Sequence, residues 1–177
     1  MNIWHDIEPE RITPESFIAV IEISKGGKAK YELDKETGLM RLDRILSTSM
    51  QYPANYGFIP RTYAEDFDPL DVLVLCSESI QPMALVSCSP IGILNMTDGG
   101  LKDEKIIAVC NNDLFYNSYT DVSQLPSHLF AEIRHFYEVY KTLENKETMV
   151  QEIEDRFAAQ QIIKKSINNY NKIFNKE

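Results

Sequence analysis

The sequence predicts an α+β domain that is mainly β, because strands come first along the chain and helices come last. Short apolar runs separated by Pro, Gly or Asp clusters fill the first two thirds of the chain. Their spacing suits a small antiparallel barrel. After Pro126 the apolar residues recur with the period of a helix instead. Two C-terminal helices should therefore pack against a barrel.

The expected elements follow in order along the chain. Residues 16–24, SFIAVIEIS, are rich in β-branched residues, and residues 30–33, KYEL, alternate before a turn that ends at Gly38. Four further short strands are expected at residues 71–76, 85–88, 90–94 and 105–110. One face of the first expected helix carries Leu129, Ile133, Phe136 and Tyr140, and one face of the second carries Ile153, Phe157, Ile163, Ile167, Tyr170 and Phe174.

Composition restricts the class of protein. With 177 residues, 44% of them hydrophobic, the chain can bury a core without disulfides or metals, and we expect one domain over residues 1–177. A formal net charge of −9 disfavours binding to nucleic acid, because most of the surface would repel a phosphate backbone. An anionic ligand would need a local positive pocket.

The cysteines and the N-terminus predict a cytoplasmic protein. Cys76, Cys88 and Cys110 are an odd set without CxxC spacing, and each lies in or beside an apolar run. They are therefore expected as buried thiols in a reducing compartment. MNIWHDIEPE lacks the features of a signal peptide, and no apolar run reaches the length of a membrane span, so we expect no membrane partner.

Three carboxylates crowd the segment AEDFDPLDVLVL at the start of an expected buried strand. Because Pro69 favours an extended conformation at Asp68, Asp66 and Asp68 should project together, with Asp71 held by the strand. Converging carboxylates raise one another's pKa unless a cation neutralises them, and oxygen ligands suit magnesium, manganese or calcium. The alternative is a solvated Asx turn. An EF-hand is excluded, because the sixth and twelfth positions counted from Asp66 are Asp71 and Ser77.

A second acidic pair, Asp98 and Asp103, flanks Gly99 and Gly100. A glycine loop that folds back can bring both side chains to a common ion, although a hairpin loop with surface charges explains the residues equally well. Lys105 then begins the next strand.

Charged residues also occur inside expected strands. Lys30 and Glu32 share one face of their strand, and Glu22 is the only charge in SFIAVIEIS, which suggests a polar cavity on that face. Arg44 follows a hydrophobic run. Each of these residues alone is most often a solvated strand residue. Phenol and ammonium groups can donate to phosphate, as Tyr52, Tyr56, Tyr140 and Lys141 could, but core packing is the ordinary role of such tyrosines.

Several other chemistries are excluded by the sequence. SKGGKAKY lacks the GxxxxGK[ST] pattern of a phosphate loop. His128 and His135 are about 10 Å apart along a helix, too far to share a zinc ion. There is no GxSxG elbow and no local signature of a catalytic cysteine, so a nucleophilic side chain is not expected.

EDFDPLDVLVL resembles the D-x-D-P-x-D-V signature of the soluble family I inorganic pyrophosphatases. Positions that match the family in order and spacing run from about Ser16 to Glu144 and include Glu22, Lys30, Glu32, Arg44, Tyr52, Tyr56, Asp98, Asp103, Lys105, Tyr140 and Lys141. The resemblance implies a five-stranded OB-like closed β-barrel with flanking strands and two C-terminal helices. It also implies pyrophosphate as substrate, several Mg²⁺ ions per site with Mn²⁺ or Zn²⁺ as possible substitutes, and in bacteria usually a homohexamer.

The same resemblance implies a role for each residue. The first metal would be held by Asp66, Asp71 and Asp103, with Asp71 also serving the second, and Asp98, Asp103 and Glu32 would bind metals that arrive with substrate. Glu22 would act through metal-bound water, and Asp68 would be the general base that deprotonates the attacking water. The phosphates would be gripped by Lys30, Arg44, Tyr56, Tyr140 and Lys141, with Tyr52 and Lys105 supporting the pocket.

The chain departs from the family pattern at Phe67, Gly99 and Asn95. A bulky residue at 67 could narrow the approach to Asp66, and the glycine loop could bind its metal more weakly. Two alternatives to the enzyme are a silent metal- and phosphate-binding regulatory protein and an OB-type nucleic-acid-binding module. Acidic clusters stand where such a module needs a positive groove, and a regulatory protein would not require Lys30, Arg44 and Lys141 beside the aspartates.

Overall fold

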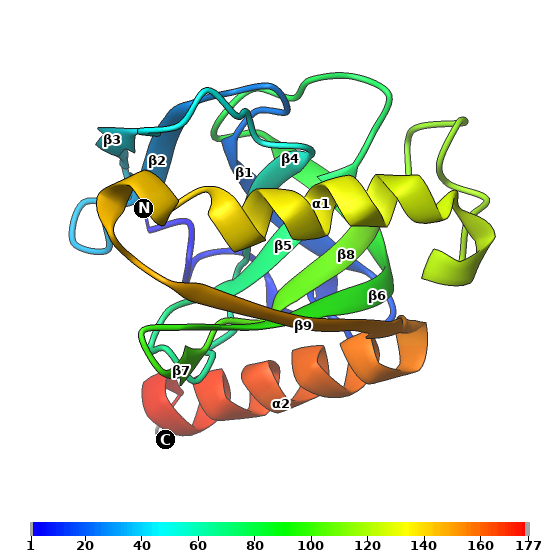
Figure 1. The fold of residues 1–177 in the computed structure, drawn as a ribbon. Coiled ribbons are helices and arrows are strands. Elements are labelled where there is room, and N and C mark those ends of the chain that lie inside the picture. Colours follow the sequence, from blue (N-terminus) through cyan, green and yellow to red (C-terminus); the bar gives the residue numbers. More distant parts are fainter. Residues whose placement is uncertain (1, 176–177) are drawn as a thin grey trace.

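A computed structural model describes residues 2–175 and shows a sheet with a helix on each side (Figure 1). The main sheet contains seven strands, in the order β1-β4-β5-β8-β6-β7 with β9 paired to β6, and β1 also pairs with β6. The pairings therefore close a ring through β1, β4, β5, β8 and β6, which confirms the predicted mainly β, OB-like fold with two C-terminal helices. The strands of this sheet are β1 (Phe17–Ile23), β4 (Asn55–Ile59), β5 (Leu70–Leu75), β6 (Leu85–Asp98), β7 (Leu101–Lys102), β8 (Lys105–Cys110) and β9 (Thr148–Asp155).

A separate two-stranded hairpin and the helices complete the fold. The hairpin pairs β2 (Ala29–Leu33) with β3 (Met40–Ile45) and lies at one end of the ring (Figure 1). The helices are α1 (Ser127–Val139) and α2 (Arg156–Phe174), with short 3-10 turns η1 (Pro9–Arg11), η2 (Val122–Gln124) and η3 (Thr142–Glu144). No helix in residues 2–175 combines the length and the apolar character needed to cross a bilayer.

The ring strands are apolar on both faces because each face meets a helix. One face packs with α2 and the N-terminal segment, and the other face packs with α1. Alternate residues of β8 divide in this way: Ile106, Ala108 and Cys110 belong to the α2 side and Ile107 and Val109 to the α1 side. The run KIIAVC is thus continuous rather than alternating, as strands covered on both faces are. The three cysteines are buried free thiols, as expected.

The strand pattern differs from the prediction in several places. The pairing of β5 with β8 is parallel, so the barrel is not wholly antiparallel. Segments 85–88 and 90–94 form one strand, β6, whose register shifts between Pro90 and Gly92. This bulge accommodates the missing N–H of the proline. Ile153 lies in β9 rather than in the second helix, which begins after Asp155, whose carboxylate accepts from the N–H of Ala158.

Strand β4 forms although Pro, Asn and Gly, which are typical turn residues, dominate YPANYGFIP. Two of these residues have other functions here. Gly57 lies against β1, where a Cβ atom would fall 1.8 Å from the Val20 carbonyl oxygen. The buried Asn55 accepts from the N–H groups of Lys25 and Ile80 and donates to the Glu78 carbonyl. Close approach and buried hydrogen bonding thus outweigh the turn propensity.

Candidate active site

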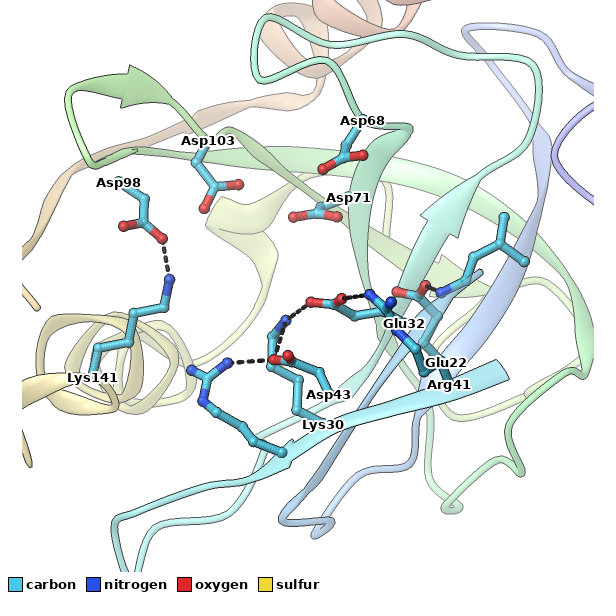
Figure 2. A network of polar contacts seen from close by, with 12 residues as sticks. Glu22, Lys30, Glu32, Arg41, Asp43, Asp68, Asp71, Asp98, Asp103 and Lys141 are labelled. Carbon is cyan, nitrogen blue, oxygen red and sulfur yellow. Dashed lines mark hydrogen bonds and ion pairs between the residues drawn. The ribbon is translucent and has the colours of Figure 1, made fainter. Parts of the chain in front are cut away.

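A cavity of about 590 Å³ opens between the ring, the β2–β3 hairpin and the end of α1. Of the fourteen residues predicted for the site, thirteen line this cavity, and Arg44 is the exception. Among the described residues, nine carboxylates and five cationic side chains contribute to the lining, so acidic groups are in excess. Figure 2 shows Asp68, Asp71, Asp98 and Asp103 on one side and Lys30, Glu32 and Arg41 on the other.

Asp71 and Lys105 form the base of the cavity because they begin the parallel strands β5 and β8 directly opposite each other. The Lys105 ammonium lies 2.8 Å from Asp71 Oδ2 and 3.0 Å from Asp103 Oδ1, and the lysine is 2% exposed. Burial raises the pKa of Asp71 in spite of Lys105. Burial also acts to raise the pKa of Asp103, but Lys105 outweighs it and that pKa is lowered. Burial opposes the charge on Lys105, yet the two carboxylates raise its pKa well above the ordinary value.

The Asp66–Asp68 segment is a turn, and the predicted extended conformation is wrong. Phe67 has a φ of 70°, and the N–H of Asp68 donates to Asp66 Oδ1 over 3.2 Å. This is the Asx-type contact considered as the alternative, yet both carboxylates still line the cavity. Burial, and then the charges of Asp71 and Asp103, raise the pKa of Asp66 to about 6.

The glycine loop is the tip of the hairpin that β6 and β7 form, and it folds Asp103 back towards Asp98. Gly99 and Gly100 have φ values of 57° and 83°, which permit the tight reversal from β6 into β7. The N–H of Asp103 then donates to the Met96 carbonyl over 2.9 Å. Asp98 and Asp103 consequently line the same cavity, and Lys141, which follows α1, forms an ion pair with Asp98 (Figure 2).

The β2–β3 hairpin supplies the opposite wall. Lys30 forms ion pairs with Glu32 and with Asp43, and Arg41 lies 3.6 Å from Glu32 (Figure 2). Glu22 of β1 reaches this wall, where its carboxylate accepts from the N–H of Leu33 over 2.9 Å. Burial, and then the charge of Asp71, raise the pKa of Glu22 to about 8.

Tyrosines surround the Lys105 ammonium. It lies 5.4 Å from the ring centroid of Tyr56 and 5.2 Å from that of Tyr137. Tyr52 contacts Tyr56 with a centroid separation of 5.4 Å, and the Lys141 ammonium lies 5.3 Å from the Tyr140 ring. Burial raises the pKa of Tyr52, Tyr56 and Tyr140, so their hydroxyl groups remain hydrogen-bond donors at neutral pH.

Arg44 lies on β3 opposite Lys30, outside the residues that line the cavity. Its guanidinium donates to Asp43 over 2.7 Å and to Glu144 over 2.8 Å. Its Nη2 atom is buried and makes no hydrogen bond within the described residues. The role predicted for Arg44 stays a prediction.

Sequence reasoning missed several residues that line the cavity. The tip of the hairpin contributes Asp34, Lys35 and Glu36, β3 contributes Arg41, and α1 contributes Tyr137. Lys35 forms an ion pair with Asp68. Lys35 could have been predicted from the sequence, because it lies in the polar turn that directly follows Lys30 and Glu32.

The donor set fits divalent metal ions. As the side chains are placed, no three carboxylate, imidazole or thiol groups in residues 2–175 form a metal-holding cluster, and ammonium groups lie among the carboxylates. Carboxylates nevertheless remain in excess in the lining, and burial followed by neighbouring carboxylates raises the pKa of Asp66 and, in spite of Lys105, that of Asp71. Hard oxygen ligands of this kind suit Mg²⁺ or Mn²⁺.

Comparisons with known proteins show which family the chain resembles. The family described as inorganic pyrophosphatase matches residues 19–171. Soluble inorganic pyrophosphatase 2 of Chlamydomonas reinhardtii is 49% identical over 167 residues, which are 94% of this chain and 87% of the relative. A soluble inorganic pyrophosphatase of Solanum tuberosum is 56% identical over 147 residues, which are 83% of this chain and 70% of the relative.

Solved structures show the same fold. The inorganic pyrophosphatase of Thermus thermophilus superposes with a TM-score of 0.89 at 36% identity, covering 97% of this chain and 99% of that one. The inorganic pyrophosphatase of Helicobacter pylori gives 0.88 at 39% identity, covering 94% and 99%. With the fold, the cavity and the sequence in agreement, the chain belongs to the inorganic pyrophosphatase family.

Proposed function

We propose that this protein hydrolyses inorganic pyrophosphate to two orthophosphates by direct attack of water, without a covalent intermediate. The observation that carries the proposal is that thirteen residues expected for this chemistry, drawn from six strands and four connecting segments, line one cavity. Members of the family are metal-dependent hydrolases, and the acidic excess of the cavity supports such a dependence here.

The metal ions would be held by carboxylates. Asp66, Asp71 and Asp103 would bind the first, and Asp98, Asp103 and Glu32 those that accompany the substrate, with Glu22 acting through water. Magnesium is the metal we propose, with manganese or zinc as substitutes. Bound divalent cations would neutralise the pyrophosphate tetra-anion and make water a stronger nucleophile.

The other side chains perform the remaining tasks. Asp68, whose side chain is half exposed to the cavity, would accept the proton of the attacking water. Lys30, Lys141, Tyr56 and Tyr140 would donate to phosphate oxygens and stabilise the charge that develops on the leaving group, and Arg44 would do so from β3. Lys105 and Tyr52 would keep the base of the cavity in place. Each lysine now pairs with a carboxylate, so the substrate would have to compete for these ammonium groups.

The resemblance to bacterial relatives also supports three proposals about the whole protein. We propose a single domain over residues 1–177, a cytoplasmic location and a homohexamer. Sedimentation velocity of the purified protein tests the last of these, since a monomer or dimer at micromolar concentration would contradict it.

The function is tested by measuring phosphate release from pyrophosphate with magnesium, with chelator, and with the Asp68→Asn variant. We expect magnesium-dependent release that chelator abolishes and that the variant lowers by about two orders of magnitude or more, the usual contribution of a general base. A folded wild-type protein that releases no phosphate with magnesium, manganese or zinc would instead be a metal- and phosphate-binding regulatory protein.

A further inference from the structure

Lys35 lines the cavity but is not among the site residues predicted from the sequence. Its ammonium forms an ion pair with Asp68. The other cavity lysines pair elsewhere: Lys30 with Glu32 and Asp43, Lys105 with Asp71 and Asp103, and Lys141 with Asp98. Within the described residues, Asp68 therefore receives its positive partner from the tip of the β2–β3 hairpin. This arrangement distinguishes Asp68 from the carboxylates nearer the base of the cavity.

The turn that carries Lys35 is fixed by its own hydrogen bonds. Asp34 Oδ1 accepts from the N–H groups of Glu36 and Thr37 and from the Thr37 hydroxyl. Gly38, with a φ of 73°, donates its N–H to the Asp34 carbonyl over 2.8 Å. An Asx-capped turn of this kind holds its residues in one conformation. The backbone of Lys35 is thus positioned before any ligand binds.

The N-terminal segment connects this turn to the loop that carries Asp68. Asn2 donates to the Lys35 carbonyl over 2.8 Å, and the Lys35 ammonium lies 5.7 Å from the ring centroid of the buried Trp4. The Trp4 indole N–H donates to the Thr62 carbonyl over 3.0 Å, at the beginning of the same loop. The two partners of the ion pair are therefore anchored to one shared segment.

We propose that Lys35 is a positioning residue that orients the Asp68 carboxylate for its part in catalysis. The inference rests on the proposed function. The ammonium keeps one carboxylate oxygen of Asp68 engaged, so the other oxygen is directed to the attacking water. The side chains of Lys35 and Asp68 are 47% and 50% exposed, and a pair this open to solvent contributes little to folding stability. Loss of Lys35 should consequently alter catalysis without unfolding the protein.

The experiment is a double-mutant cycle on pyrophosphate hydrolysis with Lys35→Ala, Asp68→Asn and the combined variant. We expect Lys35→Ala to lower kcat about tenfold, part of what a general base contributes, while KM changes by less than about twofold. In the Asp68→Asn background the same change should lower kcat by less than about twofold, because a residue acting through Asp68 has nothing left to position. Lys35→Arg should recover most of the lost kcat.

The control is Lys164→Ala, which removes an equal charge from an exposed position on α2 and should leave kcat and KM unchanged. Thermal unfolding of every variant should coincide with that of the wild type. A rise in KM at constant kcat, or a further tenfold loss in the Asp68→Asn background, would overturn the inference alone, because Lys35 would then act on the substrate or independently. A wild-type protein without turnover would overturn the proposed function, and the inference with it.

Discussion

The ammonium of Lys105 lies 2.8 Å from the carboxylate of Asp71, and these residues begin two parallel strands that are adjacent in the ring. Lys105 also reaches Asp103 at 3.0 Å and is almost wholly buried. In the absence of metal, this lysine is the positive charge in contact with both carboxylates. Because both residues begin strands of the ring, the folding stability of the ring should depend on whether the charges of these carboxylates are neutralised.

Replacing Lys105 with Met should destabilise the protein in the presence of chelator. Asp71 and Asp103, whose side chains are 19% and 15% exposed, would lose their ammonium partner, and breaking a buried ion pair from one side costs about 3–5 kcal/mol of unfolding free energy. Denaturant unfolding measures this loss. Added magnesium should restore part of it, because a ligand that binds only the folded state stabilises that state.

Lys102→Met is the matched control for that experiment. Lys102 is more than half exposed and lies 3.9 Å from Glu104, so its loss should change the unfolding free energy by less than about 0.5 kcal/mol. Equal stability of the Lys105 and Lys102 variants would show that Lys105 does not compensate the buried carboxylates.

Glu22 should make the stability of the metal-free protein depend on pH. Its pKa is raised to about 8 by burial and then by Asp71, from an ordinary value of 4.5. Between these two values the folded state binds more protons than the unfolded state, so stability falls as the pH rises. The loss begins above the unfolded pKa, amounts to roughly 1.4 kcal/mol per pH unit within the window, and is complete above the folded pKa.

The Glu22→Gln variant cannot ionise at this position and keeps a side-chain oxygen that can accept from Leu33. With chelator present, it should be more stable than the wild type at pH 9 by a few kcal/mol, and this advantage should shrink towards pH 4.5. Urea unfolding across that range measures the difference. Glu15→Gln, at an exposed position, serves as control. A difference that does not change with pH would contradict a raised pKa at Glu22.

Local sequence patterns predicted where helices and strands lie along the chain, but they predicted poorly which of these elements are adjacent in space. The apolar runs gave β1, β5 and β8, and the helical period gave α1 and most of α2. The same patterns could not place β5 parallel to β8, because that pairing joins Asp71 to Lys105 across 34 residues of chain. The family resemblance, rather than periodicity, brought these two residues to one predicted site.

The site residues that escaped prediction depend on contacts made by other segments. Lys35 belongs to the site because two residues more than thirty positions earlier in the chain contact it. Asn2 donates to its carbonyl, and Trp4 lies beside its ammonium. Arg44 lies outside the lining because Glu144, a hundred residues away, binds its guanidinium. The spacing of residues along the chain cannot predict either set of contacts, because both join segments that are distant in sequence.

Phe67 should show the cost of its backbone conformation. At a φ of 70° an L-residue is strained by roughly 1 kcal/mol, and at 63% exposure the ring gains little from burial. Phe67→Gly removes the strain but adds freedom to the unfolded chain, so the unfolding free energy should change by less than about 1 kcal/mol. Phe67→Val, which introduces a β-branched residue, should lose about 1–2 kcal/mol.

Phe115→Val provides the comparison, because Phe115 is also exposed but does not have a positive φ. Its replacement should change stability by less than about 0.5 kcal/mol. Equal losses of stability in Phe67→Val and Phe115→Val would contradict the prediction that the positive φ at position 67 is costly for a β-branched residue.

Thr62 should be the buried support of the loop that carries Asp66 and Asp68. Its hydroxyl donates to the Ile59 carbonyl over 2.6 Å and accepts from the N–H of Leu70 over 2.8 Å, which joins the two ends of this loop. Thr62→Val leaves that buried N–H without a partner and should cost about 1–3 kcal/mol of unfolding free energy. Thr62→Ser keeps the hydroxyl and should lose less, since only a methyl group is removed.

The same two variants should differ in their need for metal. A loop with one end released holds its carboxylates less firmly, so the magnesium concentration for half-maximal phosphate release should rise several-fold in Thr62→Val and hardly change in Thr62→Ser. Activity titrations with magnesium, carried out well below the unfolding temperature of both variants, separate this effect from stability. If Thr62→Val is destabilised but needs no more magnesium than the wild type, the hydroxyl supports the fold alone and the carboxylates are positioned by Phe67 and Pro69.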